Sequence, residues 1–593
     1  MSGILRSLAL VTLFLRGVGM ASQEPLSAAE SCRVEVVDKE NGWPVPLVEL
    51  RTTSDIVLVT DNAGIIAVDQ PDLLNREIWF DVSGHGYGVK TDGFGATGVR
   101  VTPRSGHTVR IEVERSIIAK RLGRLTGGGI FAESQQLGER GDWQESGVFG
   151  CDTVQVANHR GRRFWLWGDT DLPSYRFGVF HSTSATTELR PITKFEPPLA
   201  LHYDYFRNEK GAPRGVAEFP GKGPTWIGGY VSLPDRAGAA KLVATYLKIR
   251  PPLEAYEAGL CVWNDEAEKF EQLRKVWTKT SSAPERPLMP DGHPALWRDH
   301  AGKEWLLLGN PLPNFRCPAT FEAWQDAATW EKLEPQKTLP TVDGGEVKPH
   351  TGSIAWNDYR GRYVMIVTQH YGSTSLLGEV WYAEADTPLG PWVFARKILT
   401  HDNYSFYNPK QHPMFDQQGG RVIYFEGTYT NTFSGTKTPT QRYDYNQLMH
   451  RLDLADERLA LPVPVYQLAD SGSRHGLREL AEPARVRRPV VFYALDRPRA
   501  GSVPVVAVQD AQDRQQLVIP APSSEAPTAA LFHALPADMQ DPPPHTAPLW
   551  AYDNAATGEQ LYTTDANWTR PNFTRAAKPL CRVWMDPRTP RGP

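Results

Sequence analysis

The sequence is poor in cysteine, in net charge and in long apolar runs, and each scarcity excludes a class of protein. Only five cysteines occur in 593 residues. Their spacing matches neither a zinc motif nor a dense disulfide framework, so we expect buried thiols, with room for one disulfide whose pair the sequence does not choose. The formal net charge of −4 provides no basic field for nucleic acid or for an anionic membrane. No apolar stretch is long enough to cross a bilayer.

Helical periodicity and the familiar catalytic signatures are also scarce. The chain holds 18 Trp, 21 Tyr and 50 Gly, and aromatic, glycine-rich sequence is typical of twisted sheets and turns. No GxSxG, HExxH or Cys/His signature appears, which argues against a peptidase. Because 593 residues are too many for one core, the sequence predicts an all-β protein of about three or four domains.

The N-terminus has the pattern of an export signal. Arg6 gives a positive start, residues 8–15 form a short apolar run, and residues 19–21 (GMA) offer a small-x-small cleavage site. Arg16 ends the run before it could form a membrane-spanning helix. We expect a signal peptide over residues 1–21 and a monomeric protein that is secreted, periplasmic or at the cell surface.

Residues 31–116 show short strands separated by turns, which predicts a small β-sandwich. Residues 32–37 (CRVEVV) alternate as a strand, and a second strand ends in the turn 60–64 (TDNAG). This pattern resembles the carboxypeptidase-regulatory-like sandwich, in which a TDxxG turn follows a strand. The resemblance assigns no chemistry to this unit.

An internal repeat dominates residues 147–468. A turn followed by an apolar strand recurs five times, roughly 60 to 70 residues apart. Five copies of a four-stranded unit predict a five-bladed β-propeller, with six blades as the alternative. The second strands are expected at 163–169, 241–247, 304–309, 362–368 and 421–427. The inner strands are expected at 152–156, 225–233, 294–297, 351–356 and 413–415, and the third strands at 178–183, 257–263, 317–324, 379–385 and 447–454.

Polar and aromatic residues stand where the five inner strands are expected to begin. A propeller leaves its axial funnel open at that point, so these residues would converge on one pocket. Three imidazoles beside an aspartate would suit a divalent metal, although their spacing fits no known zinc motif. They would equally bind sugar hydroxyls or neutralise a uronate or sulfate. The residues are Asp152, Trp226, His293, His350 and the segment 407–412, which ends in His412.

The most specific pattern lies in the first repeat, at residues 150–154 (GCDTV) and 165–170 (WLWGDT). It resembles the opening blade of five-bladed glycosidases of the arabinanase type. The similarity is greatest to the family first catalogued as domain of unknown function 4185, which includes endo-D-arabinofuranases and carries GxD and WLFGDT at these places. The resemblance continues at residues 379–392 (EVWYAEADTPLGPW) and 407–413 (YNPKQHP), and covers about half of the propeller.

The resemblance implies that Asp152 and Asp169 are the paired carboxylates of a glycoside hydrolase. One protonates the leaving oxygen, and the other activates water or attacks the anomeric carbon. We expect Asp152 as base and Asp169 as acid, with the roles open to exchange and the stereochemical course open. Glu379 or Glu257 would be the acid if Asp169 is not. The chain departs from the family at His350, where members often carry an acidic or small residue.

The expected ligand is a polysaccharide or oligosaccharide. Two alternatives remain: a polysaccharide lyase that uses His and Tyr with a metal, and a surface protein that binds glycan without cleaving it. The residues expected to contact sugar, by stacking or by hydrogen bonds, are Trp226, His293, His350, Tyr407, His412 and Tyr429.

The C-terminal part, residues 486–588, is expected to be a small β domain. Proline-rich linkers surround strand-like segments in this part of the chain. Residues 552–564 (YDNAATGEQLYTT) resemble the aromatic-rich repeat of small β domains appended to secreted enzymes. That resemblance leaves open whether the domain attaches to carbohydrate or caps the chain.

Overall fold

The computed structural model describes residues 31–189, 195–299, 301–468, 474–477, 490–512, 514–521 and 529–588. The predicted signal peptide, residues 1–21, lies outside these described residues. The prediction of a mostly β protein is confirmed, because the described chain holds many strands and only two short α-helices, α1 (Ala132–Gln136) and α2 (Phe321–Gln325). In the described ranges no helix is long and apolar enough to cross a membrane.

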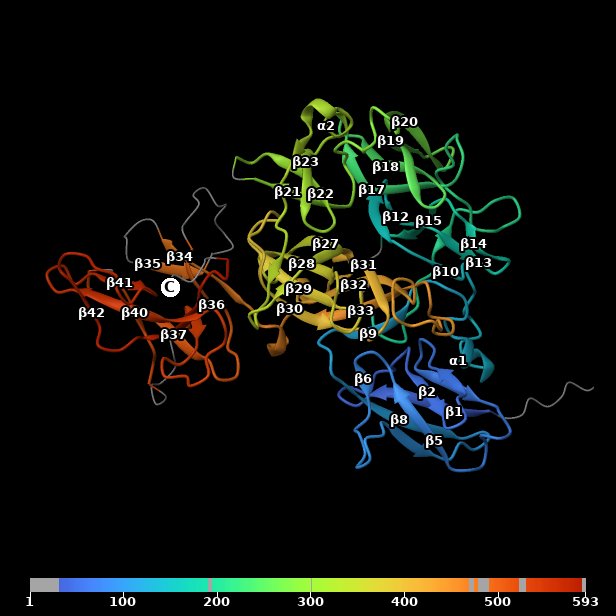
Figure 1. The fold of residues 1–593 in the computed structure, drawn as a ribbon, viewed down its shortest axis with the longest axis horizontal. Coiled ribbons are helices and arrows are strands. Elements are labelled where there is room, and N and C mark those ends of the chain that lie inside the picture. Colours follow the sequence, from blue (N-terminus) through green and yellow to red (C-terminus); the bar gives the residue numbers. More distant parts are fainter. Residues whose placement is uncertain are drawn as a thin grey trace, which may run out of the picture.

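The N-terminal unit, blue in Figure 1, consists of two four-stranded sheets that share one core. Val34 and Val113 of one sheet and Leu50 and Phe80 of the other are fully buried in that core, as expected for sheets packed face to face. The sheet orders are β4-β1-β8-β6 and β3-β2-β5-β7. The strands are β1 (Cys32–Asp38), β2 (Glu49–Thr52), β3 (Val57–Val59), β4 (Ile65–Val68), β5 (Ile78–Ser83), β6 (Tyr87–Gly88), β7 (Gly98–Val101) and β8 (Thr108–Arg115).

Five four-stranded antiparallel sheets follow one another along the middle of the chain (Figure 1). The first strand of each sheet contacts the first strand of the next, from β11 through β17, β21 and β27 to β31. The first three sheets are β11 (Gln155–His159), β12 (Arg162–Trp167), β15 (Thr183–Glu188), β16 (Asp204–Tyr205); β17 (Thr225–Pro234), β18 (Ala240–Arg250), β19 (Glu254–Asn264), β20 (Lys269–Thr278); and β21 (His293–Arg298), β22 (Glu304–Gly309), β23 (Pro313–Pro318), β24 (Glu331–Lys332). The last two are β27 (Pro349–Asn357), β28 (Arg362–Gln369), β29 (Val380–Ala385), β30 (Val393–Leu399); and β31 (Ser405–Gln411), β32 (Val422–Thr430), β33 (Asn446–Asp453), β9 (Lys120–Arg124).

The fourth strand of the fifth sheet comes from before the repeat. Strand β9 pairs antiparallel with β33, with Leu448 opposite Arg124. The same strand anchors the N-terminal unit, because the buried Arg121 guanidinium donates to the carbonyls of Pro46 and Leu47 at 2.9 and 3.1 Å. Strand β9 therefore ties the beginning of the chain to the end of the five-sheet region.

Four strand predictions are wrong in detail. The strand expected at residues 317–324 is β23, which ends at Pro318, and Phe321–Gln325 form helix α2. Residues 413–415 form a 3-10 helix, η2 (Pro413–Phe415), with Pro413 at its first position, and β31 is the inner strand instead. Residues 178–183 are divided between two sheets, because β14 (Tyr175–Val179) pairs with β13 (Thr170–Leu172), which also pairs with β10 (Gly150–Cys151). The first inner strand begins at Gln155 rather than at Asp152, since Thr153 has φ +54° and interrupts the extended chain.

The C-terminal part forms a ten-stranded sheet of its own, red in Figure 1. It packs against the fourth sheet, where the rings of Phe394 and Tyr493 lie 5.2 Å apart. Its strands are β34 (Pro462–Leu468), β35 (Arg474–Leu477), β36 (Val490–Leu495), β37 (Val503–Gln509), β38 (Gln515–Val518), β39 (Phe532–Ala534), β40 (Thr546–Asn554), β41 (Gln560–Thr563), β42 (Phe573–Arg575) and β43 (Cys581–Trp584). The remaining short elements are β25 (Leu339–Pro340), β26 (Glu346–Val347), η1 (Ala327–Thr329), η3 (Gln418–Gly420) and η4 (Glu457–Leu459). All five cysteines are buried free thiols.

Candidate active site

The two predicted carboxylates lie side by side at the end of a short ladder. Strands β10 and β13 pair antiparallel with Cys151 opposite Thr170, so Asp152 follows one strand just where Asp169 precedes the other. The N–H of Gly168 donates to the backbone carbonyl of Asp152 at 2.9 Å. A Cβ at Gly168 would come within 2.2 Å of Asp152 Oδ1. Glycine at 168 therefore leaves room for the Asp152 carboxylate.

Asp152 is held by donors from distant parts of the chain. Tyr407 Oη, on β31 of the fifth sheet, donates to Asp152 Oδ2 at 2.8 Å. Burial raises the pKa of Asp152 to about 6, although hydrogen bonds from Tyr407, Tyr445, Thr153 and the backbone N–H of Asp169 all lower it. Donors that favour the ionised form thus partly offset the cost of burying it.

Asp169 has fewer hydrogen-bond donors than Asp152. Its Oδ1 accepts a hydrogen bond of 2.8 Å from Trp226 Nε1 at the start of β17, and the same indole N–H also reaches the carbonyl of Phe180 at 3.1 Å. Burial, and then the negative charge of Asp152, raise the pKa of Asp169 to about 7, and the Trp226 bond lowers it. Asp169 therefore keeps a proton to higher pH than Asp152 does.

This difference divides the roles within the pair. The charge of Asp152 is among the causes that raise the pKa of Asp169, so the two carboxyl groups titrate as a coupled pair. The environment favours the protonated form more at Asp169 than at Asp152, which leaves Asp152 ionised. An acid beside a base, set apart by their surroundings, is the arrangement that enzymes use for general acid–base chemistry.

Exposed aromatic side chains surround this end of the five sheets. Ser405 pairs with Thr430, so the segment that follows β32 and carries the exposed Phe433 lies at the opening where β31 begins. The ring of Phe433 lies 6.2 Å from that of Tyr407. Tyr371, after β28, and Phe180, beside Trp226, are also exposed.

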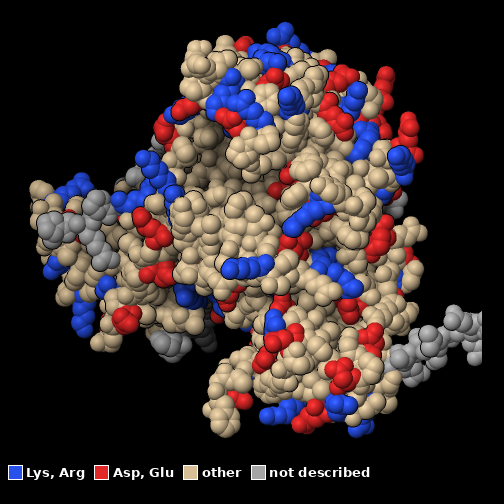
Figure 2. All heavy atoms as spheres, turned by 45° about the vertical axis from the view of Figure 1, so that its right-hand side comes forward, with Lys and Arg blue, Asp and Glu red and all other residues tan. Residues whose placement is uncertain are grey.

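The upper part of the molecule, which holds these sheets, is hollowed, and the walls of the hollow are mostly uncharged (Figure 2). A hollow with few charged residues on its walls is typical of a ligand site.

The three predicted histidines do not form a metal site. His412 is fully buried and its Nε2 lies 2.7 Å from Glu426 Oε1, so it belongs to the core. His350 is half-buried, with its ring 5.2 Å from that of His370. His293, the first residue of β21, is buried, and burial, followed by the charges of Lys410 and His412, holds its pKa well below the usual range. Over the described ranges no three His, Cys, Asp or Glu side chains gather as a metal would require.

Glu379 and Tyr429 are engaged in other contacts. The Glu379 carboxylate is buried 2.9 Å from Lys397 Nζ. Burial alone would raise its pKa, but Lys397 and two hydroxyl donors outweigh that effect and lower it, so Glu379 is poorly suited to be an acid. Tyr429 is fully buried, bonds His85 Nε2 at 2.9 Å and stacks on Tyr404 at 4.1 Å, so it has no free face for a sugar. Glu257 is paired with Lys275 at 2.6 Å. The structure therefore places Glu379 in a buried ion pair and Tyr429 in a buried aromatic stack.

Sequence reasoning missed two residues near the carboxylates. Tyr445 bonds Asp152 through its side chain and accepts the N–H of Cys151 at its backbone oxygen at 2.8 Å. Nothing in the sequence around Tyr445 signals this role. Lys410 lies within the segment 407–412, but only Tyr407 and His412 of that segment were predicted to contact a ligand.

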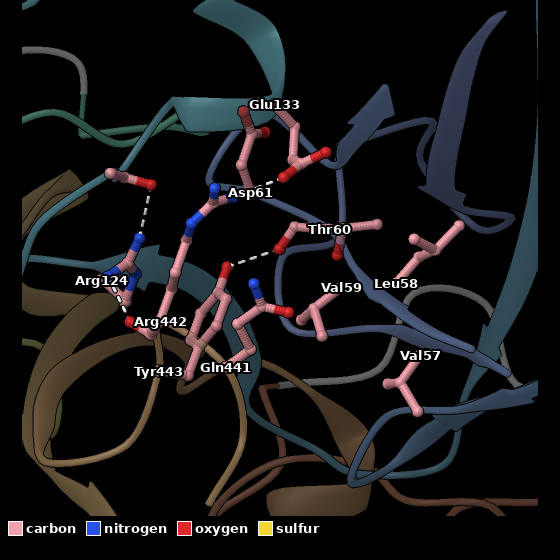
Figure 3. Close-up of a pocket in the computed structure, with 11 residues that line it drawn as sticks. Val57, Leu58, Val59, Thr60, Asp61, Arg124, Glu133, Gln441, Arg442 and Tyr443 are labelled. Atoms are coloured by element: carbon pink, nitrogen blue, oxygen red, sulfur yellow. Dashed lines mark hydrogen bonds and ion pairs between the residues drawn. The ribbon is translucent and has the colours of Figure 1, made fainter. Parts of the chain in front are cut away.

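Two further hollows lie outside the carboxylate site. One, of about 370 Å³, is where β3 meets the segment Gln441–Tyr443, with Arg124 and Glu133 on its walls (Figure 3). Figure 3 shows the Tyr443 hydroxyl pointing to the carbonyl of Thr60, a bond of 2.7 Å. The other, of about 710 Å³, is lined by Trp143 and His202 among others. Neither includes Asp152 or Asp169.

Comparison with known proteins returns no family model and no curated protein that matches this chain. Solved structures do match at low identity. An exo-1,5-α-L-arabinanase from a bovine ruminal metagenomic library is 13% identical, covers 52% of this chain and 94% of its own, with a TM-score of 0.31. A GH43_1 enzyme from Xanthomonas citri, solved with xylose, is 12% identical over 55% and 91%, with a TM-score of 0.29.

The matches also include enzymes with other activities. An exo-β-1,3-galactanase from Phanerochaete chrysosporium, solved with β-1,3-galactotriose, is 9% identical over 73% of this chain and 91% of its own, with a TM-score of 0.31. An N-acetylgalactosamine deacetylase from F. plautii is also 9% identical, over 54% and 93%, with a TM-score of 0.30. Likeness at this level does not assign an activity, because one fold hosts many chemistries.

Proposed function

We propose that this chain is a glycoside hydrolase that cleaves a polysaccharide or oligosaccharide between Asp152 and Asp169. One observation carries the proposal. Two neighbouring carboxyl groups, each with a raised pKa and each held by a different donor set, lie close to exposed aromatic rings. Tyr407, which bonds Asp152, contacts the ring of Phe433, and Trp226, which bonds Asp169, also donates to the carbonyl of Phe180. Aromatic rims and paired carboxylates together suit a sugar chain bound across an acid–base pair.

The chemistry follows from the two environments. Asp169 donates its proton to the glycosidic oxygen as the bond to the anomeric carbon breaks. Asp152, ionised, takes a proton from the attacking water or itself attacks the anomeric carbon. Tyr407 orients the Asp152 carboxylate, and Trp226 orients Asp169. Trp226 is therefore a positioning residue as well as a candidate contact for sugar.

The hydrolase has more support than the two alternatives. A lyase of the expected kind would need a free imidazole base, whereas His412 is bonded to Glu426 and His293 is buried. A protein that only binds glycan would gain nothing from two adjacent carboxyl groups, because burying them without use costs free energy.

The proposal also includes the arrangement of the domains and the location of the protein. The five sheets would be the blades of a closed propeller that ends at Asp453 rather than at residue 468, because β34 belongs to the C-terminal sheet, with β9 completing the fifth blade. Residues 31–116 would be a carboxypeptidase-regulatory-like sandwich and residues 486–588 an accessory β domain. The protein would be a secreted, periplasmic or cell-surface monomer with a signal peptide over residues 1–21.

A polysaccharide panel tests the proposal. We expect the full-length protein to release reducing sugar from at least one glycan, and Asp152→Asn or Asp169→Asn to lower kcat by roughly 10²- to 10⁴-fold. Asp204→Asn is the matched control, because Asp204 is exposed on the outermost strand of the first sheet. Unchanged release by both site variants would remove the pair from the mechanism. An unsaturated, ultraviolet-absorbing product would instead establish the lyase.

A further inference from the structure

Lys410 is a buried cation without a partner. Its side chain is 8% exposed, yet within the described part of the chain its Nζ makes no hydrogen bond and no ion pair. Lys248, which is fully buried, shows the usual solution, since its Nζ donates to the carbonyls of Phe219 and Gly223 at 3.0 and 2.8 Å and to Thr225 Oγ1 at 3.3 Å. An unpaired buried charge destabilises a fold. Lys248 has partners that offset this cost, whereas Lys410 has none among the described residues.

The acid directly opposite Lys410 on the neighbouring strand does not pair with it. Lys410 faces Glu426 in the β31–β32 ladder, but Glu426 Oε1 is bonded to His412 Nε2 at 2.7 Å. Glu426 Oε2 is buried without a hydrogen-bond partner and forms no ion pair with Lys410. Burial alone lowers the pKa of Lys410 to about 8, with no neighbouring charge among the causes. The amine is therefore still protonated at neutral pH, and no carboxylate among the described residues forms an ion pair with it.

The ammonium group lies toward the inside of the five-sheet region. Its charge lowers the pKa of His293, which begins the first strand of the third sheet, although Lys410 belongs to the fifth sheet. The Nδ1 atom of His293 is itself buried without a hydrogen-bond partner. The two side chains come from different sheets, and the charge of Lys410 acts on the imidazole of His293.

This place is connected to the carboxylate pair through one strand. Tyr407, which bonds Asp152, precedes Lys410 by three residues on β31, a separation of roughly 10 Å or less along the strand. The register of the ladder shifts between Tyr407 and Lys410, and Asn408 has φ +52°. The local irregularity places an acid-binding tyrosine and an unpaired lysine on the same short segment, at a spacing that a short oligosaccharide spans.

We propose that Lys410, with His293, forms an anion subsite for the carboxylate or sulfate group of an acidic sugar. The inference rests on the proposed function and narrows its substrate to an acidic glycan. Paired carboxylates repel a negatively charged ligand, so a cation at a fixed distance from them also sets which sugar of the chain carries the charge. A neutral glycan would leave the ammonium group unpaired.

Matched ligand pairs test the subsite without any variant. We expect the full-length protein to bind glucuronate and galacturonate at least about tenfold more tightly than glucose and galactose, measured by calorimetry. Glucose 6-sulfate separates the two anions, because tighter binding of either the uronates or the sulfate identifies the group that the subsite takes. Equal binding of charged and neutral sugars would overturn the inference.

Variants assign the effect to Lys410. Lys410→Met should abolish the preference for charged sugars, and Lys410→Arg should retain part of it, whereas Lys269→Met, at an exposed lysine of β20, should leave it unchanged. Lys410→Met should also raise Tm, because an uncompensated buried charge is removed, whereas a structural lysine would give a loss. If Lys410→Met still prefers charged sugars, the proposal is contradicted. If Lys410→Met does not fold, the proposal is contradicted when Lys410→Arg loses the preference and also has a lowered Tm.

The subsite and the hydrolase can fail separately. Asp169→Asn should keep the preference for charged sugars while it loses hydrolysis. Cleavage of neutral glycans with no charge preference would leave the hydrolase standing and remove the subsite. Preferential binding of uronates with no cleavage of any glycan would support the subsite and remove the hydrolase.

Discussion

At the scale of single residues, the surroundings of two identical carboxyl groups give them different properties. Asp152 has donors from Tyr407 and Tyr445, whereas Asp169 has one side-chain donor, Trp226, and the negative charge of its neighbour. Burial raises both pKa values, and the donor sets then separate them. The carboxylate that is less well solvated by the protein becomes the acid, which is how a fold can run both halves of acid–base catalysis near neutral pH.

Trp226→Phe tests this division of roles through the pH profile. We expect kcat/KM of the parent to be bell-shaped, with its acid limb near pH 6 and its basic limb near pH 7. The Trp226 N–H bond favours ionised Asp169, so its loss raises the pKa of Asp169. The protonated acid then persists to higher pH, and the basic limb should move up by about one unit while the acid limb stays in place.

The control is the same substitution, Trp to Phe, at a position away from the carboxylate pair. Trp356 Nε1 donates to Asp358 Oδ1 at 2.8 Å, the same bond length, on a strand end away from the carboxylate pair. Trp356→Phe should leave both limbs where they are. An acid limb that moves up in Trp226→Phe while the basic limb stays in place would exchange the roles of the two aspartates.

At the scale of elements, apolar runs made most strands predictable and polar segments hid the rest. The second strands, such as β28 and β32, are almost entirely buried and stand out in the sequence. Strand β31 was missed because it carries Asn408, Pro409 and Lys410, which are rare in sheet interiors. Strand β9 was missed because it pairs across most of the chain and lies outside the repeat. Both exceptions belong to the fifth sheet, which supplies Tyr407 and Lys410.

Leu122→Ala tests the contribution of β9. The Leu122 side chain is fully buried in the core that also holds Trp165 and Met449, so its truncation leaves a cavity between the first and fifth sheets. We expect a loss of about 3 kcal/mol in the free energy of unfolding, measured by urea denaturation. Leu296→Ala, at an exposed leucine of β21, should cost less than about 0.5 kcal/mol. Equal costs would mean that β9 is not a structural part of the fifth sheet.

At the scale of the whole molecule, the site joins residues that the sequence separates widely. The motif around Asp152 and Asp169 could be predicted because both aspartates lie within one repeat. Their partners Tyr407 and Tyr445 could not, since Tyr407 lies on β31 and Tyr445 directly precedes β33, and only the fold brings the fifth sheet beside the first. The expected histidine cluster failed for a related reason. Side chains alternate between the two faces of a strand, and the face that carries His412 turns it into the core against Trp165.

The N-terminal unit is joined to the five-sheet region through buried polar contacts, and this predicts how the molecule unfolds. The Arg121 guanidinium is fully buried and donates to the carbonyls of Pro46, Leu47 and Gly84, while Tyr443 Oη donates to Thr60. Removing the Arg121 side chain leaves several buried carbonyl acceptors without a hydrogen bond. Arg121→Ala should therefore separate the calorimetric unfolding of the N-terminal unit from that of the five sheets, with the first transition lowered by about 3 kcal/mol.

Arg100→Ala provides the comparison, because Arg100 is exposed and lies over Trp79 on the surface of the same unit. It should leave the two parts unfolding together. If Arg121→Ala also unfolds in a single transition at the parent temperature, the two parts are coupled by apolar packing alone. If the parent already unfolds in two transitions, they are not coupled. The predicted outcome, coupling that depends on one guanidinium, would make β9 both the last strand of the fifth sheet and the joint that positions the N-terminal unit, because Arg121 and Leu122 are neighbours on that strand and serve opposite sides of it.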